Sequence, residues 1–434
     1  MMRDGDTIVA LSSGAVPSGV AVVRLSGPAA GAVLSAMLGA LPKPRHLTLA
    51  PIAIGGELLD RGLVAWFPAP HSFTGEDCAE LQVHGSPAVI RGLLRALTAL
   101  PGVRLADAGE FTRRAFENGK LDLTEVEGLG DLIEAETEGQ RMQAIARFSG
   151  QLSAQLEGWR DRLLDLRAEL EAQLDFSDEG DVGELSADFR PALTVLSQEI
   201  HVAIDSVARG RIVREGLRVA LAGPPNAGKS SLLNALARSD VAIVTDEPGT
   251  TRDVREVAID LGGQLVILLD MAGLRDTDSK AEAEGVRRAR REIAEADLVL
   301  WLISPDVPAA GFEEEPAAPM WRVATKADLG PAQPDSEFAV SARTGEGLPA
   351  LVERLRNFAN TVTAGEPPLV SRERDLSALK GAAAALREAE RQLAEPEIAA
   401  EALREAAYAL ERLLGRMDAE TVLDRLFSAF CIGK

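Results

Sequence analysis

Residues 223–231 read GPPNAGKSS and bring glycines, a lysine and hydroxyl side chains into one short segment. They fit the pattern G-x-x-x-x-G-K-[ST], with an apolar run before them and a helical segment after them. The backbone N–H groups of such a loop, and of the helix that follows, form a cradle for phosphates. Lys229 would place its charge at the β- and γ-phosphates, and Ser230 would offer a hydroxyl to Mg²⁺. The segment therefore predicts a nucleotide-binding loop.

A second motif, TKAD at residues 325–328, indicates which base the nucleotide carries. The Asp328 carboxylate can accept hydrogen bonds from N1–H and the 2-amino group of guanine, whereas adenine lacks both donors and would leave the carboxylate unpaired. Residues 341–343, SAR, end a further strand, where a backbone N–H could meet O6 of guanine. The order of these motifs resembles that of GTPases of the translation-factor class, although Thr325 stands where that class usually has Asn.

Two segments between these motifs are expected to sense the γ-phosphate. The segment GTTRD begins at residue 249 and offers Thr251 as a second hydroxyl for Mg²⁺. The segment DMAG fits D-x-x-G, in which Asp270 would reach the water shell of the metal and the Gly273 amide would meet the γ-phosphate. Met271 replaces the Thr that is usual in that segment.

The residue after D-x-x-G bears on how water would be positioned for hydrolysis. Where GTPases of the Ras type have a water-orienting Gln, this chain has Leu274, which cannot orient water. Another residue must therefore do so, and the helical segment downstream offers Glu282 and Glu284. Taken alone, either glutamate is more often a solvated charge on a helix surface.

The secondary structure predicted around these motifs differs from one part of the chain to the next. Residues 1–118 mix short β-like runs, at 7–10, 19–25, 62–67 and 79–84, with turns and one helical stretch at 87–100, which predicts an α+β domain. Residues 119–215 and 363–434 are helical in pattern. Between them, residues 216–362 alternate β-rich runs with helical segments, which predicts a parallel sheet with crossover helices. We therefore predict a multidomain α/β protein, in which a P-loop domain of Ras-like type is inserted into a split helical domain.

One apolar repeat in the first helical part is long. Its members recur every three or four residues and predict a single long amphipathic helix that ends at the acidic loop of residues 175–184. The members of the repeat are Met142, Ile145, Phe148, Leu152, Leu156, Trp159, Leu163, Leu166, Leu170 and Leu174.

Composition limits the partners and the compartment. The 434 residues carry a net charge of −21, from 46 Lys and Arg against 67 Asp and Glu. Proteins that grip a phosphate backbone alone usually show a basic stripe, so a partner is expected to supply positive surface if the substrate is a nucleic acid. The two cysteines, Cys78 and Cys431, fit a reducing compartment. With no apolar run of membrane length and no secretory signal, we expect a cytoplasmic protein without a membrane anchor.

Several longer segments, together with the nucleotide motifs, resemble the tRNA-modification GTPase family MnmE, also called TrmE. They are GVAVVRLSGP from residue 19, SFTGEDCAELQVHGS from residue 72 and GEFTRRAFENGKLDLTEVEGLGDLI from residue 109. The resemblance covers essentially the whole chain. It implies that the N-terminal domain is a tetrahydrofolate-binding and dimerisation domain, with folate contacts from Arg24, Glu80, Lys120 and Lys434.

The resemblance also implies roles around the phosphates. It assigns the attacking water to Glu282, which stands three residues before Gly285, and places Glu284 off that register. It implies a K⁺ ion held by Asn226, Thr245, Glu247 through its carbonyl and Thr250 when two such domains meet. The motifs and the resemblance together give the nucleotide contacts as Asn226, Ala227, Gly228, Lys229, Ser230, Ser231, Thr245, Asp246, Glu247, Pro248, Gly249, Thr250, Thr251, Asp270, Met271, Ala272, Gly273, Thr325, Lys326, Asp328, Ser341, Ala342 and Arg343.

The last residues, FSAFCIGK, allow two interpretations of Cys431. A prenylated cysteine is disfavoured, since Lys434 is an unusual final residue and no polybasic stretch precedes it. The segment instead resembles the C-terminal signature of the family, which implies a tail docked near the folate pocket. Whether Cys431 is catalytic or only packs there stays open, because a cysteine among apolar residues more often packs.

The resemblance implies a function. A homodimer of this chain would form a heterotetramer with the FAD-containing protein MnmG (GidA). Together they would build the 5-carboxymethylaminomethyl or aminomethyl group on the wobble uridine of tRNA, with carbon from 5,10-methylene- or 5-formyl-tetrahydrofolate. GTP hydrolysis with Mg²⁺ and K⁺ would drive a conformational step. Two alternatives are a ribosome-assembly GTPase that acts as a checkpoint, which predicts a basic RNA-binding appendage, and a scaffold with a vestigial GTPase.

Overall fold

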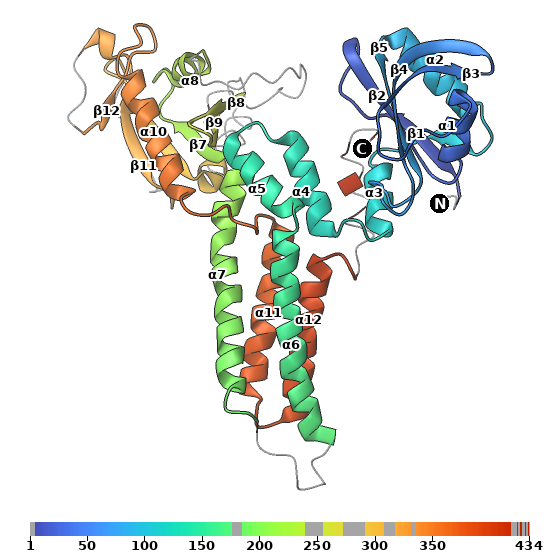
Figure 1. Ribbon diagram of the computed structural model, residues 1–434. Helices are drawn as coiled ribbons and strands as arrows, with labels where there is room; N and C mark the ends of the chain where they lie inside the picture. Colours follow the sequence, from blue (N-terminus) through green and yellow to red (C-terminus); the bar gives the residue numbers. More distant parts are fainter. Residues whose placement is uncertain are drawn as a thin grey trace, which may run out of the picture. The chain divides into compact units, whose positions relative to one another are not determined.

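The computed structural model in Figure 1 describes most of the chain. The described residues are 5–175, 185–238, 255–271, 291–307, 317–330, 335–417, 423, 426–427, 430 and 433. The chain divides into two compact units. One comprises residues 1–130 and 411–434, and the other comprises residues 131–410.

The first unit is built on a six-stranded sheet in the order β3-β4-β5-β2-β1-β6. Neighbouring strands are antiparallel except β1 and β6, which are parallel. One face carries the helices α1 and α2, whose apolar residues share a core with the strands. Four of the strands and α2 were predicted from the sequence; β3, β6 and α1 were not. The elements are β1 Thr7–Leu11, β2 Ser18–Ser26, α1 Ala30–Leu38, β3 Thr48–Ile54, β4 Glu57–Phe67, β5 Cys78–Gly85, α2 Pro87–Thr98 and β6 Val103–Leu105.

The end of the chain packs into this same unit, beside the helix α3 (Glu110–Glu117). Phe427 is buried, and the guanidinium of Arg113 lies 4.9 Å from the centre of its ring. Gly109, which precedes α3, has φ 67°, and a Cβ there would lie 2.7 Å from the carbonyl oxygen of Phe427. Further on, the Ser12 hydroxyl donates to the carbonyl oxygen of Gly433 at 2.6 Å. The described residues of the tail are thus held by the N-terminal part of the chain.

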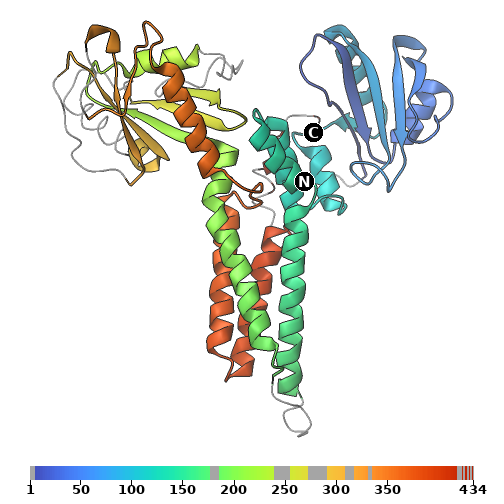
Figure 2. The same cartoon turned by 60° about the vertical axis from the view of Figure 1, so that its left-hand side comes forward.

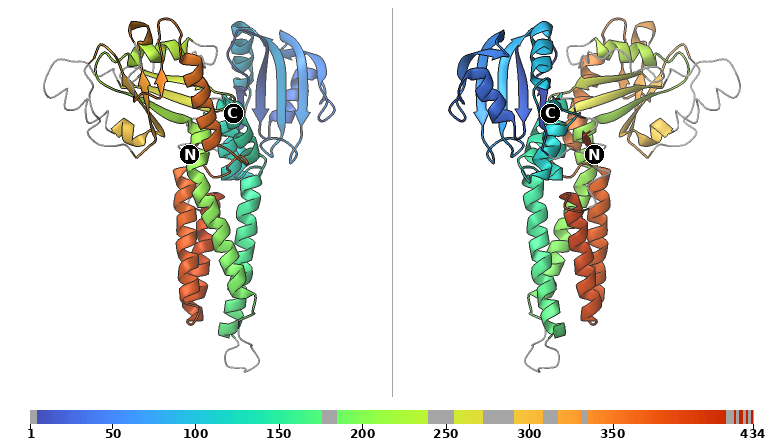
Figure 3. Two further views of the ribbon diagram at one scale, coloured as in Figure 1. Left: turned by 90° about the vertical axis from the view of Figure 1, so that its left-hand side faces the viewer. Right: turned by 90° about the vertical axis from the view of Figure 1, so that its right-hand side faces the viewer.

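In the second unit, segments far apart in the sequence form one helical domain. The long helices α6, α7, α11 and α12 run side by side in every view (Figures 1, 2 and 3). This arrangement unites the two helical parts predicted on either side of the insertion. The elements are α4 Leu123–Glu134, α5 Glu138–Phe148, α6 Gln151–Asp175, α7 Phe189–Glu215, α11 Glu373–Arg391 and α12 Pro396–Leu413. Of these, α4 and α12 cross the boundary between the units.

A fully buried ion pair fastens these two parts together. Arg147 Nη1 lies 3.0 Å from Asp375 Oδ2 and also donates to the carbonyl oxygen of Leu369 at 2.6 Å. Burial alone would raise the pKa of Asp375, but the charges of Arg147 and Arg374 hold it below its ordinary value. Removing either partner would leave a buried charge uncompensated, so the pair fixes how α5 meets α11.

The prediction of one continuous helix through residues 142–174 is wrong. Gly150, with φ 79°, ends the helical path after α5, and α6 starts afresh at Gln151. The apolar repeat continues across the break, but its first two members, Met142 and Ile145, are exposed on α5. A spacing of three or four residues shows only where apolar side chains recur. It does not reveal a residue with a left-handed backbone conformation between them, such as Gly150.

The inserted module is a second six-stranded sheet, in the order β12-β11-β10-β7-β9-β8. All neighbouring strands are parallel except β8, which forms an unpredicted antiparallel hairpin with β9. The predicted fold class is confirmed: an N-terminal α+β domain, and a helical domain interrupted by an α/β module with a P-loop. The elements are β7 Leu217–Ala222, α8 Lys229–Ala237, β8 Arg255–Asp260, β9 Leu265–Asp270, β10 Leu298–Ile303, β11 Met320–Ala324, the 3₁₀ helix η2 Ala327–Leu329, β12 Phe338–Ala339 and α10 Leu348–Val362.

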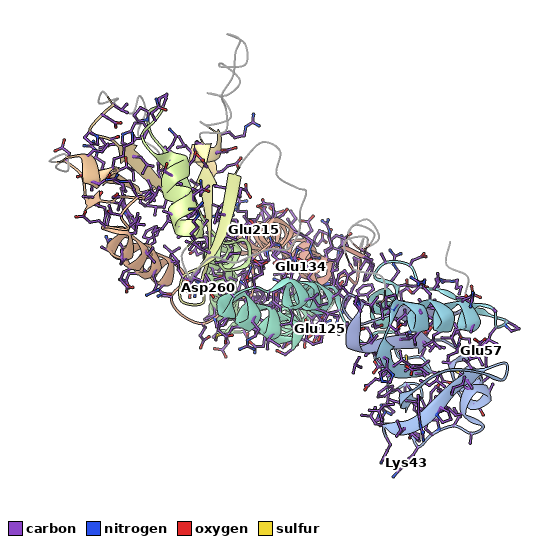
Figure 4. All side chains as sticks on the ribbon, turned by 90° about the horizontal axis from the view of Figure 1, so that it is seen from above. Lys43, Glu57, Glu125, Glu134, Glu215 and Asp260 are labelled. Atoms are coloured by element: carbon purple, nitrogen blue, oxygen red, sulfur yellow. The ribbon has the colours of Figure 1, made fainter. Side chains whose placement is uncertain are left out.

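The turn of the β8–β9 hairpin touches the helical domain. Gly262 and Gly263 have φ of 72° and 90°, the left-handed pair that a two-residue turn requires. The Gly263 N–H donates to Asp260 Oδ1 at 2.6 Å; Figure 4 labels Asp260. The Gly263 carbonyl in turn accepts the N–H of Gly139, in the first turn of α5, at 2.8 Å. A Cβ on Gly139 would lie 2.8 Å from that same oxygen, so the approach requires glycine.

No helix within the described ranges is long and apolar enough to cross a membrane.

Candidate functional site

The predicted phosphate loop lies between β7 and α8, and its backbone is curled by residues with positive φ. Gly223 has φ 142°, and a Cβ there would lie 2.5 Å from the carbonyl oxygen of Leu302 on β10. Asn226 and Gly228 have φ of 64° and 89°. Left-handed residues turn successive N–H groups of a loop toward one side, which is the geometry of an anion-binding nest.

Lys229 starts α8 and is held against the loop that precedes it. Its Nζ donates to the carbonyl oxygens of Gly223 at 2.7 Å and Pro224 at 2.8 Å, and the side chain is buried. This burial lowers the pKa of Lys229, and the nearby carboxylate of Asp270 opposes that shift. A phosphate group in the loop would favour the charged ammonium further, because an opposite charge favours the protonated form.

Asp270 lies at the carboxyl end of β9, where its Cα pairs with that of Leu221 on β7. The phosphate loop follows β7 directly, so the sheet brings this buried carboxylate to the edge where Ser230 lies in the first turn of α8. A carboxylate and a hydroxyl are the hard oxygen donors that suit Mg²⁺ beside phosphates. These two residues therefore fit the predicted magnesium site, whose third predicted member, Thr251, lies outside the described residues.

A cavity of about 280 Å³ opens beside the loop. One wall comes from the start of α8, and the other comes from the segments after β11 and β12. Most of its lining combines apolar side chains with one carboxylate, which suits a flat heterocycle with polar edges. The lining residues are Gly228, Ser231, Leu232, Thr325, Lys326, Asp328, Leu329, Val340, Ala342 and Arg343.

The carboxylate of Asp328 is engaged at both oxygens. Its Oδ1 accepts the hydroxyl of Ser341 at 2.6 Å, and its Oδ2 lies 2.9 Å from Nε of Arg343. The Ser341 hydroxyl, and then the charge of Arg343, hold the pKa of Asp328 below its ordinary value. The group is therefore an ionised acceptor at neutral pH, as recognition of the guanine edge requires.

Thr325 joins the base side of the cavity to the phosphate loop. Its buried hydroxyl donates to the carbonyl oxygen of Ala227 at 2.5 Å and lies 3.2 Å from that of Ile303. The departure from the usual Asn thus keeps a polar link to the phosphate loop. The next residue, Lys326, has φ 54° and directs its Nζ to the carboxylate of Asp306, 2.7 Å from Oδ2.

In the N-terminal unit, Arg24 and Glu80 lie directly opposite each other on β2 and β5. Both Nε and Nη2 of Arg24 donate to Glu80 Oε1, at 3.1 and 2.8 Å. The guanidinium also lies 5.2 Å from the ring centre of Phe73 and 5.8 Å from that of Phe111. The two folate candidates are therefore brought together beside an aromatic pair. Lys120 is exposed, and its side chain lies against Gly75 in the loop that carries Phe73.

Several predicted site residues lie outside the described part of the chain. They are Thr245, Asp246, Glu247, Pro248, Gly249, Thr250, Thr251, Ala272, Gly273, Glu282, Cys431 and Lys434. Of the predicted K⁺ ligands, only Asn226 is described.

Sequence reasoning missed some residues that shape these sites. In the cavity they are Leu232, Leu329 and Val340, and at its rim Asp306. Asp306 lies three residues after the end of β10, and the carboxyl ends of parallel strands converge on the ligand, so its position was a usable signal. The aromatic neighbours of Arg24 carry no such signal, because they come together only in the folded unit.

Comparison with known proteins gives matches over nearly the whole chain. The family model described as the MnmE helical domain matches residues 123–431, and that of the GTP-binding protein TrmE N-terminus matches residues 7–120. The tRNA modification GTPase MnmE of Azorhizobium caulinodans is 51% identical over 442 residues, which cover 100% of both chains. That of Rhodopseudomonas palustris is 49% identical over 446 residues and again covers 100% of both. A solved structure of Era from Aquifex aeolicus aligns with 39% of this chain and 66% of its own, at 25% identity and a TM-score of 0.27.

Proposed function

The chain belongs to the tRNA modification GTPase family MnmE, and from this membership we propose that it hydrolyses GTP as one part of a reaction that modifies tRNA. The observation that carries the proposal is the cavity between the phosphate loop and Asp328. It offers an ionised carboxylate to a base and a curled backbone to phosphates within one module. Guanine satisfies that carboxylate and adenine does not, which supports GTP over ATP.

The residues around the phosphates suggest how hydrolysis would be supported. Lys229 lies at the loop to neutralise phosphate oxygens, and Ser230 with Asp270 would hold Mg²⁺. The metal, when bound with the nucleotide, adds charge neutralisation at those oxygens. We assign the positioning of water to Glu282 and a K⁺ ion to Asn226, Thr245, Thr250 and the carbonyl of Glu247. Such a cation would take the part that an arginine finger takes in other GTPases.

We extend the proposal to a folate in the N-terminal unit. The ion pair of Arg24 and Glu80, with its aromatic neighbours, offers both charge and flat apolar surface to a pterin ring. Lys120 lies at the loop of Phe73, where its ammonium could meet a glutamate carboxylate of the folate. Lys434 and Cys431 complete the proposed site, with a catalytic role for Cys431 left open.

A homodimer and a flavin-carrying partner complete the proposed assembly. The sheet face opposite α1 and α2 exposes Leu49 and Leu63, which lie directly across from each other on β3 and β4, 64% and 37% exposed. Apolar side chains paired on a solvent-facing sheet support burial against a second copy. The net charge of −21 supports a partner that carries much of the tRNA contact and the FAD, which we take to be MnmG.

One complementation experiment tests the proposal. A strain that lacks the gene receives the wild-type chain, Glu282→Ala or Glu284→Ala, and its tRNA nucleosides are measured by mass spectrometry. We expect the C5 modification of the wobble uridine to return with wild type and Glu284→Ala, but not with Glu282→Ala. Purified proteins should show K⁺-stimulated GTP turnover, which Glu282→Ala lowers on the order of a hundredfold.

Two outcomes contradict the proposal in different ways. Unchanged wobble uridines in the deletion strain would favour a ribosome-assembly checkpoint. Equal turnover in K⁺ and Na⁺, with Glu282→Ala no slower than Glu284→Ala, would favour a scaffold whose GTPase is vestigial.

A further inference from the structure

The carboxylate that should recognise guanine is engaged by a side chain of the chain itself. Arg343 Nε lies 2.9 Å from Asp328 Oδ2, and both residues line the cavity beside the phosphate loop. Ser341 takes a position on the other oxygen at 2.6 Å. A base that enters the cavity therefore meets a carboxylate that already has a cationic partner.

The partner has the chemistry of the ligand. A guanidinium presents N–H groups side by side, as guanine does with N1–H and its 2-amino group, and a carboxylate accepts hydrogen bonds from either. In this structure one of them, Nε–H of Arg343, meets one oxygen, Oδ2 of Asp328. We propose that Arg343 binds Asp328 as an internal substitute for guanine and thereby sets the affinity of this site for guanine nucleotides. The inference rests on the proposed function, because it concerns the same site.

The backbone around Arg343 is fixed, so only its side chain has to move. The Ser341 N–H donates to the carbonyl oxygen of Glu346 at 2.9 Å, and the Gly345 N–H donates back to that of Ser341 at 2.9 Å. The Thr344 N–H is held by the Ser341 hydroxyl at 3.2 Å. These bonds close a tight turn whose projecting side chain is Arg343.

The side chains of Arg343 and Asp328 differ strongly in their exposure to solvent. The Arg343 side chain is 76% exposed, whereas that of Asp328 is 12% exposed. The arginine can therefore leave for water at little cost, while the carboxylate stays in the cavity. Exposed ion pairs contribute little to stability, and loss of this one should change nucleotide affinity about two- to fivefold.

The test measures binding of GDP to purified full-length protein by calorimetric titration. Arg343→Met removes the guanidinium and keeps the length of the side chain, so the dissociation constant of GDP should fall about two- to fivefold. Arg391→Met is the matched control, because Arg391 is 73% exposed and paired with Glu388 on α11, outside the cavity. The dissociation constant of GDP from Arg391→Met should equal that from wild type.

Two further measurements distinguish competition between Arg343 and guanine for Asp328 from a general effect of the substitution on the loop that carries Arg343. Asp328→Asn removes the carboxylate and should favour xanthosine diphosphate, and adding Arg343→Met to it should then change nothing. The advantage of Arg343→Met over wild type for GDP should also shrink as salt rises toward 1 M, because salt screens an exposed ion pair.

The outcomes are distinct. If wild type binds GDP and Arg343→Met binds it equally or more weakly, the inference is wrong and the proposed function stands. The inference would also be wrong if Arg343→Met tightened GDP binding equally in the Asp328→Asn background. If wild type does not bind GDP, the proposed function fails and this inference fails with it.

Discussion

At the scale of single residues, the hydroxyl of Thr325 joins the two halves of the nucleotide site. It donates to the carbonyl oxygen of Ala227 at 2.5 Å, within the phosphate loop, while Asp328 lies three residues later at the base. A buried carbonyl that loses its donor costs about 1–3 kcal/mol. The link is therefore strong enough to influence how well the loop holds phosphates.

We expect Thr325→Val to weaken GDP binding by about fivefold or more, because valine keeps the shape and removes the donor. Binding of guanosine, which has no phosphates, should change little. Thr325→Ser keeps a hydroxyl and is the control, with GDP affinity near that of wild type. Titration calorimetry with both ligands checks this, and equal losses for GDP and guanosine would show that Thr325 acts on the base instead.

Single residues were also where the sequence was most and least informative. Lys229, Asp270 and Asp328 could be predicted as site candidates because phosphates, metal and guanine each require particular atoms at particular places in a motif. The contacts of Arg343 with Asp328, and of Lys326 with Asp306, could not, because each joins side chains from neighbouring loops. Such pairs form only because the fold brings those loops close together. The spacing of residues within a motif gives no information about that.

At the scale of elements, the β8–β9 hairpin connects the nucleotide module to α5. One end of the hairpin turn touches Gly139, and the far end of β9 is Asp270 in the predicted magnesium site. α5 is itself anchored by a capping box of Thr137 and Gln140, and Gln140 donates to the carbonyl oxygen of Arg214 on α7 at 2.9 Å. The hairpin turn and α7 are thus both joined to the start of α5 by hydrogen bonds.

Gly139→Ala should break this contact, because the added Cβ would meet the Gly263 carbonyl oxygen at 2.8 Å. Overlap of this kind typically costs about 1–3 kcal/mol, which outweighs the helical preference for alanine. Gly158→Ala is the matched control, since a Cβ on Gly158 in α6 has nothing within 4 Å. Urea denaturation should give a lower midpoint for Gly139→Ala and a slightly higher one for Gly158→Ala; equal midpoints would refute the contact.

The strands with long apolar runs were predicted, whereas β3, β6, β8 and the apolar helix α1 were missed. The buried strands β9 and β10 consist mainly of Leu, Val and Ile, and β7 combines Leu and Val with alanines and one arginine. In contrast, β3 contains a proline, and β8 begins and ends with charged residues, so neither gave a strand signal. The break between α5 and α6 was missed because Gly150 lies within an unbroken apolar repeat.

At the scale of the whole molecule, the fold class could be predicted from changes in the spacing of apolar residues along the chain. Parallel sheets and amphipathic helices differ in that spacing. Which distant segments meet could not be predicted from it. The ion pair of Arg147 with Asp375, and the seat of Phe427 beside Gly109, join residues hundreds of positions apart. The docked tail was expected only from the resemblance to a family.

The tail gives a prediction at this scale. Gly109 and Gly119 flank α3 with φ of 67° and 64°, so alanine strains the backbone at both. A Cβ at Gly109 would also lie 2.7 Å from the carbonyl oxygen of Phe427, whereas one at Gly119 meets nothing within 4 Å. Gly109→Ala should therefore release the tail to carboxypeptidase about tenfold faster than Gly119→Ala, if the overlap lowers the free energy of releasing the tail by about 1.4 kcal/mol. Equal digestion rates, measured by intact mass, would contradict this.

The seat of Phe427 also has a consequence for how the protein is made. Strands β1 to β6 leave the ribosome hundreds of residues before Phe427 does, and the patch beside Gly109 stays uncovered throughout that interval. The first unit therefore completes its packing only after the chain has been translated as far as Phe427. A transcript cut short anywhere between these points would yield a chain whose first unit lacks the side chain that packs beside Gly109 and Arg113. Incompletely packed chains of this kind are substrates for chaperones and proteases.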